Sequence, residues 1–172
     1  MSILETRPYR WPDEAACERF AQALAGCPQI ADLSIELDGG LGAGKTSLVR
    51  HLLRALGVTG RIKSPSYAVV EDYAPPALAG APAHHFDFYR FSDPREWEDA
   101  GFRDLFAAPG LKLSEWPQKA AGMLPTADLR LVIAVNADDS RDVRAEARTA
   151  RGQALLAELD NRLDPRPTGQ EP

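Results

Sequence analysis

The apolar residues of this chain recur with two different spacings. In the segments 12–25, 45–56 and 152–163 they return every three or four positions, which is the spacing of one helix face. The pair Asp93-Pro94 is typical of a helix cap followed by the first helical position, so a short helix is predicted from there to residue 100. The other apolar runs are shorter and are predicted to be strands, at 33–37, 67–73, 84–91, 111–115, 129–135 and 143–148.

The order of these elements predicts the fold class. Helices and strands alternate in the first part of the chain, whereas strands dominate further on. This order is typical of an α/β fold with a mostly parallel central sheet, to which the later strands add in antiparallel fashion. The length of 172 residues suits one domain, predicted here for 1–163, with 164–172 as a flexible C-terminal tail. The proline-rich segment 74–83 is predicted to be a surface loop.

One predicted strand has an unusual pattern. Parallel strands that are buried on both faces are usually apolar throughout. In the segment 33–38, by contrast, every second residue is polar, namely Ser34, Glu36 and Asp38. We therefore expect one face of this strand to be covered by polar contacts.

The composition predicts the compartment of the protein and its kinds of partner. No stretch approaches the ~18 apolar residues that a membrane-spanning helix needs, and residues 1–12 lack the apolar core of a signal peptide. We expect a cytoplasmic protein without membrane contact, in which Cys17 and Cys27 stay reduced thiols. Acidic residues outnumber basic ones by 25 to 20, giving a net charge of −5. Because nucleic-acid binding usually needs a basic face, any role on a nucleic acid is expected to go through a partner.

A glycine-rich segment carries the clearest chemical signal. Gly39, Gly44, Lys45 and Thr46 match the pattern Gly-x-x-x-x-Gly-Lys-Thr, between a predicted strand and a predicted helix. Glycines let the backbone curl around phosphates, and the free N–H groups that begin the next helix attract the same anion. Lys45 is predicted to reach the β- and γ-phosphates of ATP, and the Thr46 hydroxyl to ligate Mg²⁺. The residues predicted to bind ATP are Gly39, Leu41, Gly42, Ala43, Gly44, Lys45, Thr46 and Ser47.

Three segments further along are candidates to complete such a site. Ser66 follows the loop helix, where switch segments sense a γ-phosphate. Asp87 and Glu115 each lie near the end of a predicted strand, where a carboxylate can hold Mg²⁺ or orient water. Each also has a plain structural interpretation, as a turn, a hydrogen-bonded strand face or a strand-end charge. His85 shares a strand face with Asp87, but a third ligand for a transition-metal site is missing.

Taken in order, these segments resemble the TsaE family, the ATPase subunit of the bacterial machinery that makes threonylcarbamoyladenosine in tRNA. That family shows Gly-Asp-Leu-Gly-Ala-Gly-Lys-Thr, then Ser-Pro-Thr, then His-Phe-Asp-x-Tyr-Arg, then Glu-Trp-Pro, and the resemblance covers residues 13–135. It implies a P-loop NTPase-like fold of three layers. The catalytic residues that it implies are Lys45, Ser66, Asp87 and Glu115, and the magnesium ligands are Thr46, Asp87 and Glu115.

The chain departs from the family pattern at three positions. Gly40 replaces the usual aspartate of the loop, so any contact of that carboxylate is lost. Ser66 replaces a threonine and keeps its hydroxyl, and Phe88 stands where leucine is common. None of these changes removes a group that the chemistry needs.

The resemblance also implies a function. The protein would hydrolyse ATP weakly alone and would act on a TsaB–TsaD pair, resetting that pair between turnovers of tRNA modification. It would contact tRNA only indirectly, through the complex. A module that holds ATP without turnover stays open as a simpler interpretation.

Two other P-loop classes are alternatives. A small-molecule kinase is the main one, and it usually adds an arginine-rich lid. Here the nearest arginine cluster follows the last clear strand, at Arg141, Arg144, Arg148 and Arg151. A GTPase usually selects its base with Asn-Lys-x-Asp, and the segment 136–139 (Asn-Ala-Asp-Asp) lacks the lysine, so ATP is favoured.

Overall fold

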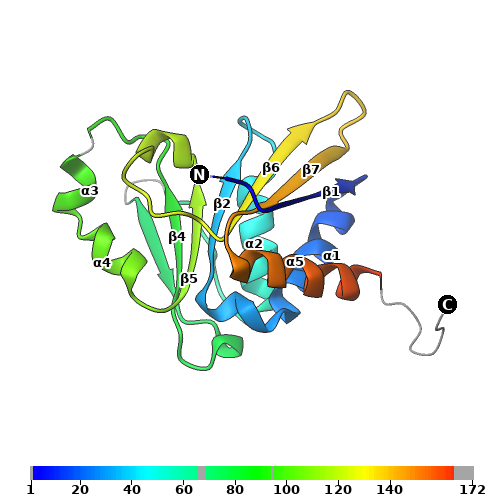
Figure 1. Cartoon of the computed structure of the whole chain (residues 1–172), viewed down its shortest axis with the longest axis horizontal. Helices are drawn as coiled ribbons and strands as arrows, with labels where there is room; N and C mark the ends of the chain where they lie inside the picture. The colour runs from blue at the N-terminus through cyan, green and yellow to red at the C-terminus, as the bar shows by residue number, and fades with distance from the viewer. Residues whose placement is uncertain (1, 66–68, 94, 165–172) are drawn as a thin grey trace.

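The computed structural model describes residues 2–65, 69–93 and 95–164, and its centre is a seven-stranded sheet (Figure 1). The strand order is β1-β7-β6-β2-β5-β4-β3. The strands are β1 (Glu5–Trp11), β2 (Ser34–Asp38), β3 (Val70–Tyr73), β4 (Ala83–Asp87), β5 (Leu111–Glu115), β6 (Leu129–Val135) and β7 (Arg141–Ala147). The α-helices are α1 (Glu14–Gly26), α2 (Lys45–Ala55), α3 (Arg95–Asp99), α4 (Phe102–Ala107) and α5 (Ala150–Leu163), and the 3-10 helices are η1 (Pro28–Asp32), η2 (Pro76–Leu78) and η3 (Pro117–Ala120).

The predicted α/β class is confirmed, and the sheet has a parallel centre. The four central strands β6, β2, β5 and β4 run parallel, so their carboxyl ends meet at one edge of the sheet. The outer strands β1, β7 and β3 are antiparallel to their neighbours. The antiparallel addition expected late in the chain is β7, and two antiparallel strands that were not expected, β1 and β3, occur earlier.

Several predicted boundaries needed correction. The strand predicted at 84–91 ends at Asp87. The chain then forms a turn, in which the Phe91 N–H donates to the Phe88 carbonyl. The predicted loop 74–83 contains η2, and α4 was not predicted at all. Pro94, residues 67 and 68 of the predicted strand 67–73, and residues 165–172 of the predicted tail lie outside the described residues. The predicted start of the first helix agrees better with the structure. Asp13, the predicted cap, accepts a hydrogen bond from the Ala16 N–H at the start of α1.

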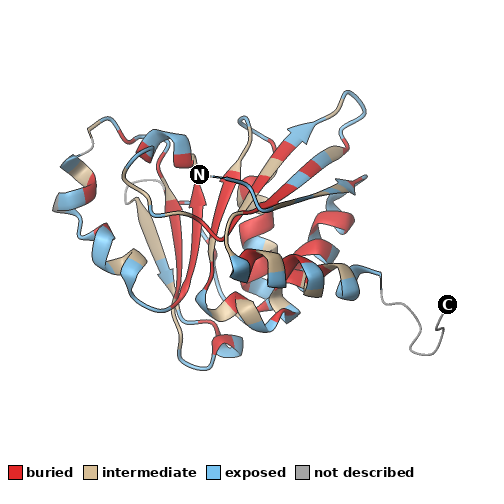
Figure 2. Cartoon of the chain, viewed as in Figure 1, coloured by how far each residue is buried: buried red, intermediate tan, exposed pale blue. Residues whose placement is uncertain are grey.

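Two clusters of buried residues lie on opposite faces of the sheet. The larger cluster fills the space between the sheet and the helices α1, α2 and α5, where the buried residues are concentrated (Figure 2). The smaller one is aromatic and joins β4 to α3, α4 and η3 through Phe86, Trp97, Phe102 and Ala120. Figure 1 shows α3 and α4 on the left, beyond β4 and apart from the other helices. Helical elements on both faces give the three layers that were expected.

The face of β2 that points away from α2 is polar, as its sequence predicts. The register places Glu36 beside Arg130 of β6, and Arg130 in turn beside Glu146 of β7. An Arg130 guanidinium nitrogen lies 3.7 Å from a Glu36 carboxylate oxygen and another lies 2.7 Å from Asp38. Carboxylates and guanidinium groups thus alternate from strand to strand across this face.

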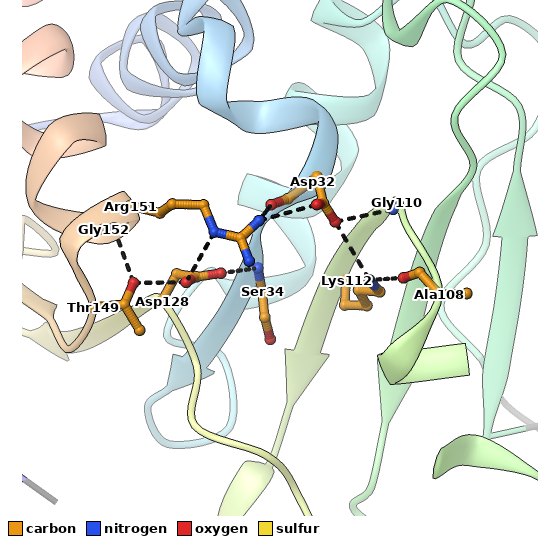
Figure 3. Close-up of polar contacts among 9 residues, drawn as sticks. All are labelled: Asp32, Ser34, Ala108, Gly110, Lys112, Asp128, Thr149, Arg151 and Gly152. Carbon is orange, nitrogen blue, oxygen red and sulfur yellow. Dashed lines mark hydrogen bonds and ion pairs between the residues drawn. The ribbon is translucent and has the colours of Figure 1, made fainter. Parts of the chain in front are cut away.

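A polar network closes the end of the sheet at which the parallel strands begin (Figure 3). The Asp128 carboxylate accepts hydrogen bonds from the Ser34 N–H at 3.0 Å and from the Thr149 hydroxyl at 2.6 Å. Thr149 caps α5 by accepting from the Gly152 N–H at 3.1 Å. These contacts fix the start of α5 against β2. The glycine-rich segment lies at the opposite edge, where β2 and the other parallel strands end.

Two further expectations concern the whole chain. Cys17 and Cys27 are both free and buried, in line with the predicted reduced thiols. Of the helices in the described ranges, none combines the length and the apolar character that crossing a membrane requires.

Candidate functional site

The glycine-rich segment lies at the carboxyl edge of the parallel strands, between β2 and α2. Gly44 precedes the first residue of α2 with φ of 106°, a left-handed conformation that residues with a side chain rarely adopt. Gly39 is required for a different reason, because a Cβ atom there would lie 2.8 Å from the Ile133 carbonyl oxygen. The loop therefore needs glycine both for its backbone angle and for its close approach to β6.

Arg141, at the start of β7, holds the loop from one side. Its Nε donates to the Ala43 carbonyl at 3.2 Å, and its Nη2 lies 3.3 Å from the Gly42 carbonyl. These contacts fix the loop and add a positive charge at its edge. The sequence had placed Arg141 only in an arginine cluster, because nothing local indicates that the β6–β7 hairpin brings it back to the loop.

The Lys45 side chain is buried inside the loop. Its ammonium group donates to the Gly39 carbonyl and to the Gly40 carbonyl, at 3.3 Å for the latter. It also lies 3.8 Å from the centroid of a Trp116 ring, a cation–π distance. Burial lowers the pKa of Lys45, and the charges of Glu115 and other carboxylates oppose that effect. Phosphates that bind in the loop would have to replace these contacts of the ammonium.

Trp116 reaches Lys45 through an uncommon backbone conformation. Its φ is 55°, a left-handed value that is unusual for a bulky residue and often marks a functional position. Its ring also packs on Tyr89, with the centroids 4.9 Å apart. Trp116 and Tyr89 belong to matched motifs, but the sequence assigned neither of them to the site.

The predicted magnesium ligands come together beside the loop. The Thr46 hydroxyl donates to the Glu115 carboxylate, at 3.0 Å from Oε1 and 3.2 Å from Oε2. The β4–β5 register places Asp87 directly opposite Glu115. Burial raises the pKa of Asp87, while the Tyr89 N–H, donating to its Oδ1 at 3.0 Å, lowers it.

The chemistry of these three groups suits Mg²⁺ better than a transition metal. Within the described ranges, no group of three or more His, Cys, Asp or Glu residues is placed to hold a metal ion. Mg²⁺ prefers oxygen ligands, keeps several waters and is usually bound by one or two carboxylates together with substrate phosphates. Two carboxylates and one hydroxyl match that requirement.

A hollow of about 390 Å³ joins these groups. It is lined by the predicted ATP-binding residues except Gly39, by Asp87 and Glu115, and by the residues Ser64, Tyr89, Trp116 and Arg141. Ser66, the predicted switch hydroxyl, lies outside the described residues. A second hollow of about 230 Å³ adjoins Gly44, Ser47 and Arg141 and is bounded by Trp11, Asp13, Glu14 and Cys17.

Larger hollows occur elsewhere but lack this chemistry. The one between β1 and α5, of about 630 Å³, contains Arg7, Tyr9 and Asp160. There the Asp160 carboxylate already accepts a hydrogen bond from the Tyr9 hydroxyl, at 2.6 Å, and pairs with Arg7. Another, of about 710 Å³, lies over β1, β6 and β7. Neither adjoins the glycine loop, so the hollow of about 390 Å³ is the candidate site.

The four arginines of the predicted cluster do not gather over the candidate site as the lid of a small-molecule kinase would. Arg144 and Arg148 both pair with Glu146 on β7, and Arg151 pairs with Asp32 at the far end of the sheet (Figure 3). Of the predicted cluster, Arg141 lines the hollow. The kinase alternative therefore gains no support from these residues.

Comparisons with known proteins agree with the order of the motifs. The family model described as "Threonylcarbamoyl adenosine biosynthesis protein TsaE" matches residues 11–143. The tRNA threonylcarbamoyladenosine biosynthesis protein TsaE of Haemophilus influenzae is 38% identical over 154 residues, covering 87% of this chain and 95% of that protein. The Bacillus subtilis protein of the same name is 34% identical over 125 residues, covering 73% and 76%.

A solved structure agrees as well. The crystal structure of Bacillus subtilis YdiB superposes with a TM-score of 0.75 at 25% sequence identity, covering 94% of this chain and 98% of that one. This likeness confirms the predicted P-loop NTPase-like fold.

Proposed function

This chain belongs to the TsaE family, and from that premise we propose that it is an ATP-hydrolysing subunit of tRNA threonylcarbamoyladenosine biosynthesis. The observation that carries the proposal is the contact between Thr46 and Glu115 beside Lys45. A hydroxyl that begins the loop helix and a carboxylate that ends a parallel strand are the pair with which P-loop ATPases hold magnesium.

Each residue of the site then has a task. The loop backbone and Lys45 bind the β- and γ-phosphates, which draws Lys45 away from Trp116. Thr46 and Glu115 would hold Mg²⁺, with Asp87 beside them, and the ion would neutralise charge on the phosphate oxygens. The smaller hollow beside Gly44 and Ser47 accommodates the nucleoside.

We further propose that a TsaB–TsaD pair is the partner and that ATP hydrolysis resets this pair between turnovers. Such coupling requires the ATP and ADP states to differ in affinity for the partner. Two exposed apolar residues that line the hollow support this proposal, since they are available to a partner. Leu41 is 76% exposed at the tip of the loop, and Tyr89 is 45% exposed beside Trp116.

The test is a reconstituted modification assay that contains the TsaB–TsaD pair, tRNA and either the wild-type chain or Glu115→Gln. We expect the partner pair to stimulate ATP turnover, and Glu115→Gln to abolish both that turnover and multiple-turnover modification. The matched control is Glu146→Gln, since Glu146 is also a buried glutamate but lies on the reverse face of the sheet. Undiminished modification with Glu115→Gln, or no ATP turnover by the wild type with its partners, would refute the proposal.

A further inference from the structure

His85 lies behind the two carboxylates of the candidate site. It is 1% exposed and shares a face of β4 with Asp87, because residues two apart on a strand point the same way. The parallel register pairs His85 with Leu113 and Asp87 with Glu115. His85 is therefore one step further from the strand ends than the carboxylates, and its Nε2 lies 2.5 Å from Glu115 Oε2.

The chemistry of the pair fixes which atom donates. An ionised carboxylate can only accept, so the hydrogen of this bond belongs to His85 Nε2. The other ring nitrogen, Nδ1, is buried and has no hydrogen-bond partner in the part of the chain that the structure describes. The imidazole thus directs its hydrogen bond to Glu115.

Glu115 is held by two donors that differ in their relation to the metal. Thr46 donates from the loop helix, and its hydroxyl oxygen is itself a proposed magnesium ligand. A hydroxyl can ligate a metal through a lone pair and still donate its hydrogen, so Thr46 can keep its contact with Glu115 while it holds the ion. Thr46 lies 3.0 Å from Oε1 and 3.2 Å from Oε2, whereas His85 contacts Oε2 at 2.5 Å from behind the strand ends. The shorter bond from His85 therefore holds Oε2 and leaves Oε1 directed at the loop.

We infer that His85 is a positioning residue, which orients the Glu115 carboxylate so that one oxygen faces the magnesium-bound phosphates. This inference rests on the proposed function, because Glu115 acts on a nucleotide only if ATP binds in the adjoining loop. Partners that orient metal-binding side chains typically change metal affinity or activity by about 10- to 100-fold when they are removed.

Three substitutions separate the hydrogen bond from the volume of the ring. His85→Phe keeps an aromatic ring of similar size and removes the donor. His85→Gln places an amide N–H near the position of Nε2, whereas His85→Asn carries its amide on a shorter side chain. The matched control is His84→Phe, since His84 is also buried but points to the other face and bonds Asp72 of β3 at 2.6 Å.

The readouts are steady-state ATP turnover with the partner pair and the affinity of Mn²⁺ for the complex of each variant with ADP. In His85→Phe we expect kcat and Mn²⁺ affinity each to fall by about 10-fold or more. KM for ATP should change little, because the loop backbone and Lys45 still bind the phosphates. His85→Gln should regain much of both quantities, His85→Asn should not, and His84→Phe should match the wild type.

Wild-type kcat and Mn²⁺ affinity in His85→Phe would overturn the inference. So would equal losses in His85→Phe and His85→Gln, because the ring and not the hydrogen bond would then matter. If His85→Phe does not fold, the difference between the Gln and Asn variants decides the question, and no difference overturns it. If the wild type shows no turnover, the proposed function fails, and the Mn²⁺ affinities alone decide the role of His85.

Discussion

Lys45→Ala should weaken ATP binding strongly without unfolding the protein. The Lys45 ammonium contacts two loop carbonyls and the Trp116 ring. ATP binding exchanges these contacts for the β- and γ-phosphates. The affinity therefore depends on the difference between two sets of contacts and not on the phosphate contacts alone.

The magnitude follows from that exchange. The two carbonyl bonds that are given up and the phosphate bonds that replace them are both hydrogen bonds of a charged group and roughly cancel. The phosphates add their negative charge, whose attraction for the ammonium is ~4 kcal/mol at ~4 Å and an effective dielectric constant of ~20. Loss of the cation–π contact subtracts ~0.5–2 kcal/mol. A net contribution of ~2–3.5 kcal/mol remains, and at ~1.4 kcal/mol per tenfold this predicts a Kd about 30- to 300-fold higher. Because burial already lowers the pKa of Lys45, its charge costs folding energy, and we expect little loss of stability on removing it.

The assay is calorimetry of ATP with Mg²⁺, together with a thermal melt of each variant. Lys112→Ala is the matched control, because Lys112 is 4% exposed and burial lowers its pKa as well. Lys112, however, donates to the Ala108 carbonyl at the opposite end of the sheet (Figure 3). An affinity loss below about threefold for Lys45→Ala, or an equal loss for Lys112→Ala, would refute the reasoning.

Three further outcomes are expected. Burial raises the pKa of Glu36 above its ordinary value of 4.5, so the ionised form lowers the stability of the fold at neutral pH. Glu36→Gln should therefore have a higher melting temperature than the wild type at pH 7. The difference in melting temperature should disappear below pH 4.5, where Glu36 is protonated in the folded and the unfolded chain. Equal melting temperatures at pH 7 would contradict this. Gly152→Ala would put a Cβ atom 2.0 Å from the Asp128 carbonyl oxygen. Urea unfolding should therefore show a free energy of unfolding that is lower by about 1–3 kcal/mol or more. An unchanged urea midpoint would contradict this. At Gly40 a Cβ atom meets nothing within 4 Å, so Gly40→Asp should keep the wild-type midpoint, and a clear drop would show that the loop does not tolerate the family aspartate.

The fold was predictable where neighbouring residues alone determine an element. The helix that begins at Lys45 and the strand Leu111–Glu115 carry their own periodicity and were found at nearly their true bounds. The strand Glu5–Trp11 was missed because it alternates charged residues with few apolar ones and contains Pro8. An edge strand needs a partner on one side only, and here that partner is β7, whose paired residues lie 130 to 142 positions further along the chain.

The same limit applies to the site. Lys45 and Thr46 were predictable because the loop motif contains both. The bond from His85 to Glu115 spans 30 positions, and the contact from Arg141 to the Ala43 carbonyl spans 98. Those pairings depend on strand order and register, which the spacing of apolar residues along a chain does not specify.

The alternating charges on the face of the sheet that points away from α2 favour one alignment of β7 along β6. A slip of β7 by two residues along β6 would keep all apolar side chains facing the helices, so the core alone would hardly distinguish the two alignments. The slipped strand would instead place Arg144 or Arg148 beside Arg130, depending on its direction, and like charges side by side are repelled. A slip of that size would also carry Arg141 about 7 Å from the carbonyls that it holds. Charged side chains far from the nucleotide site thereby disfavour misaligned strands, in which Arg141 could no longer contact the glycine loop.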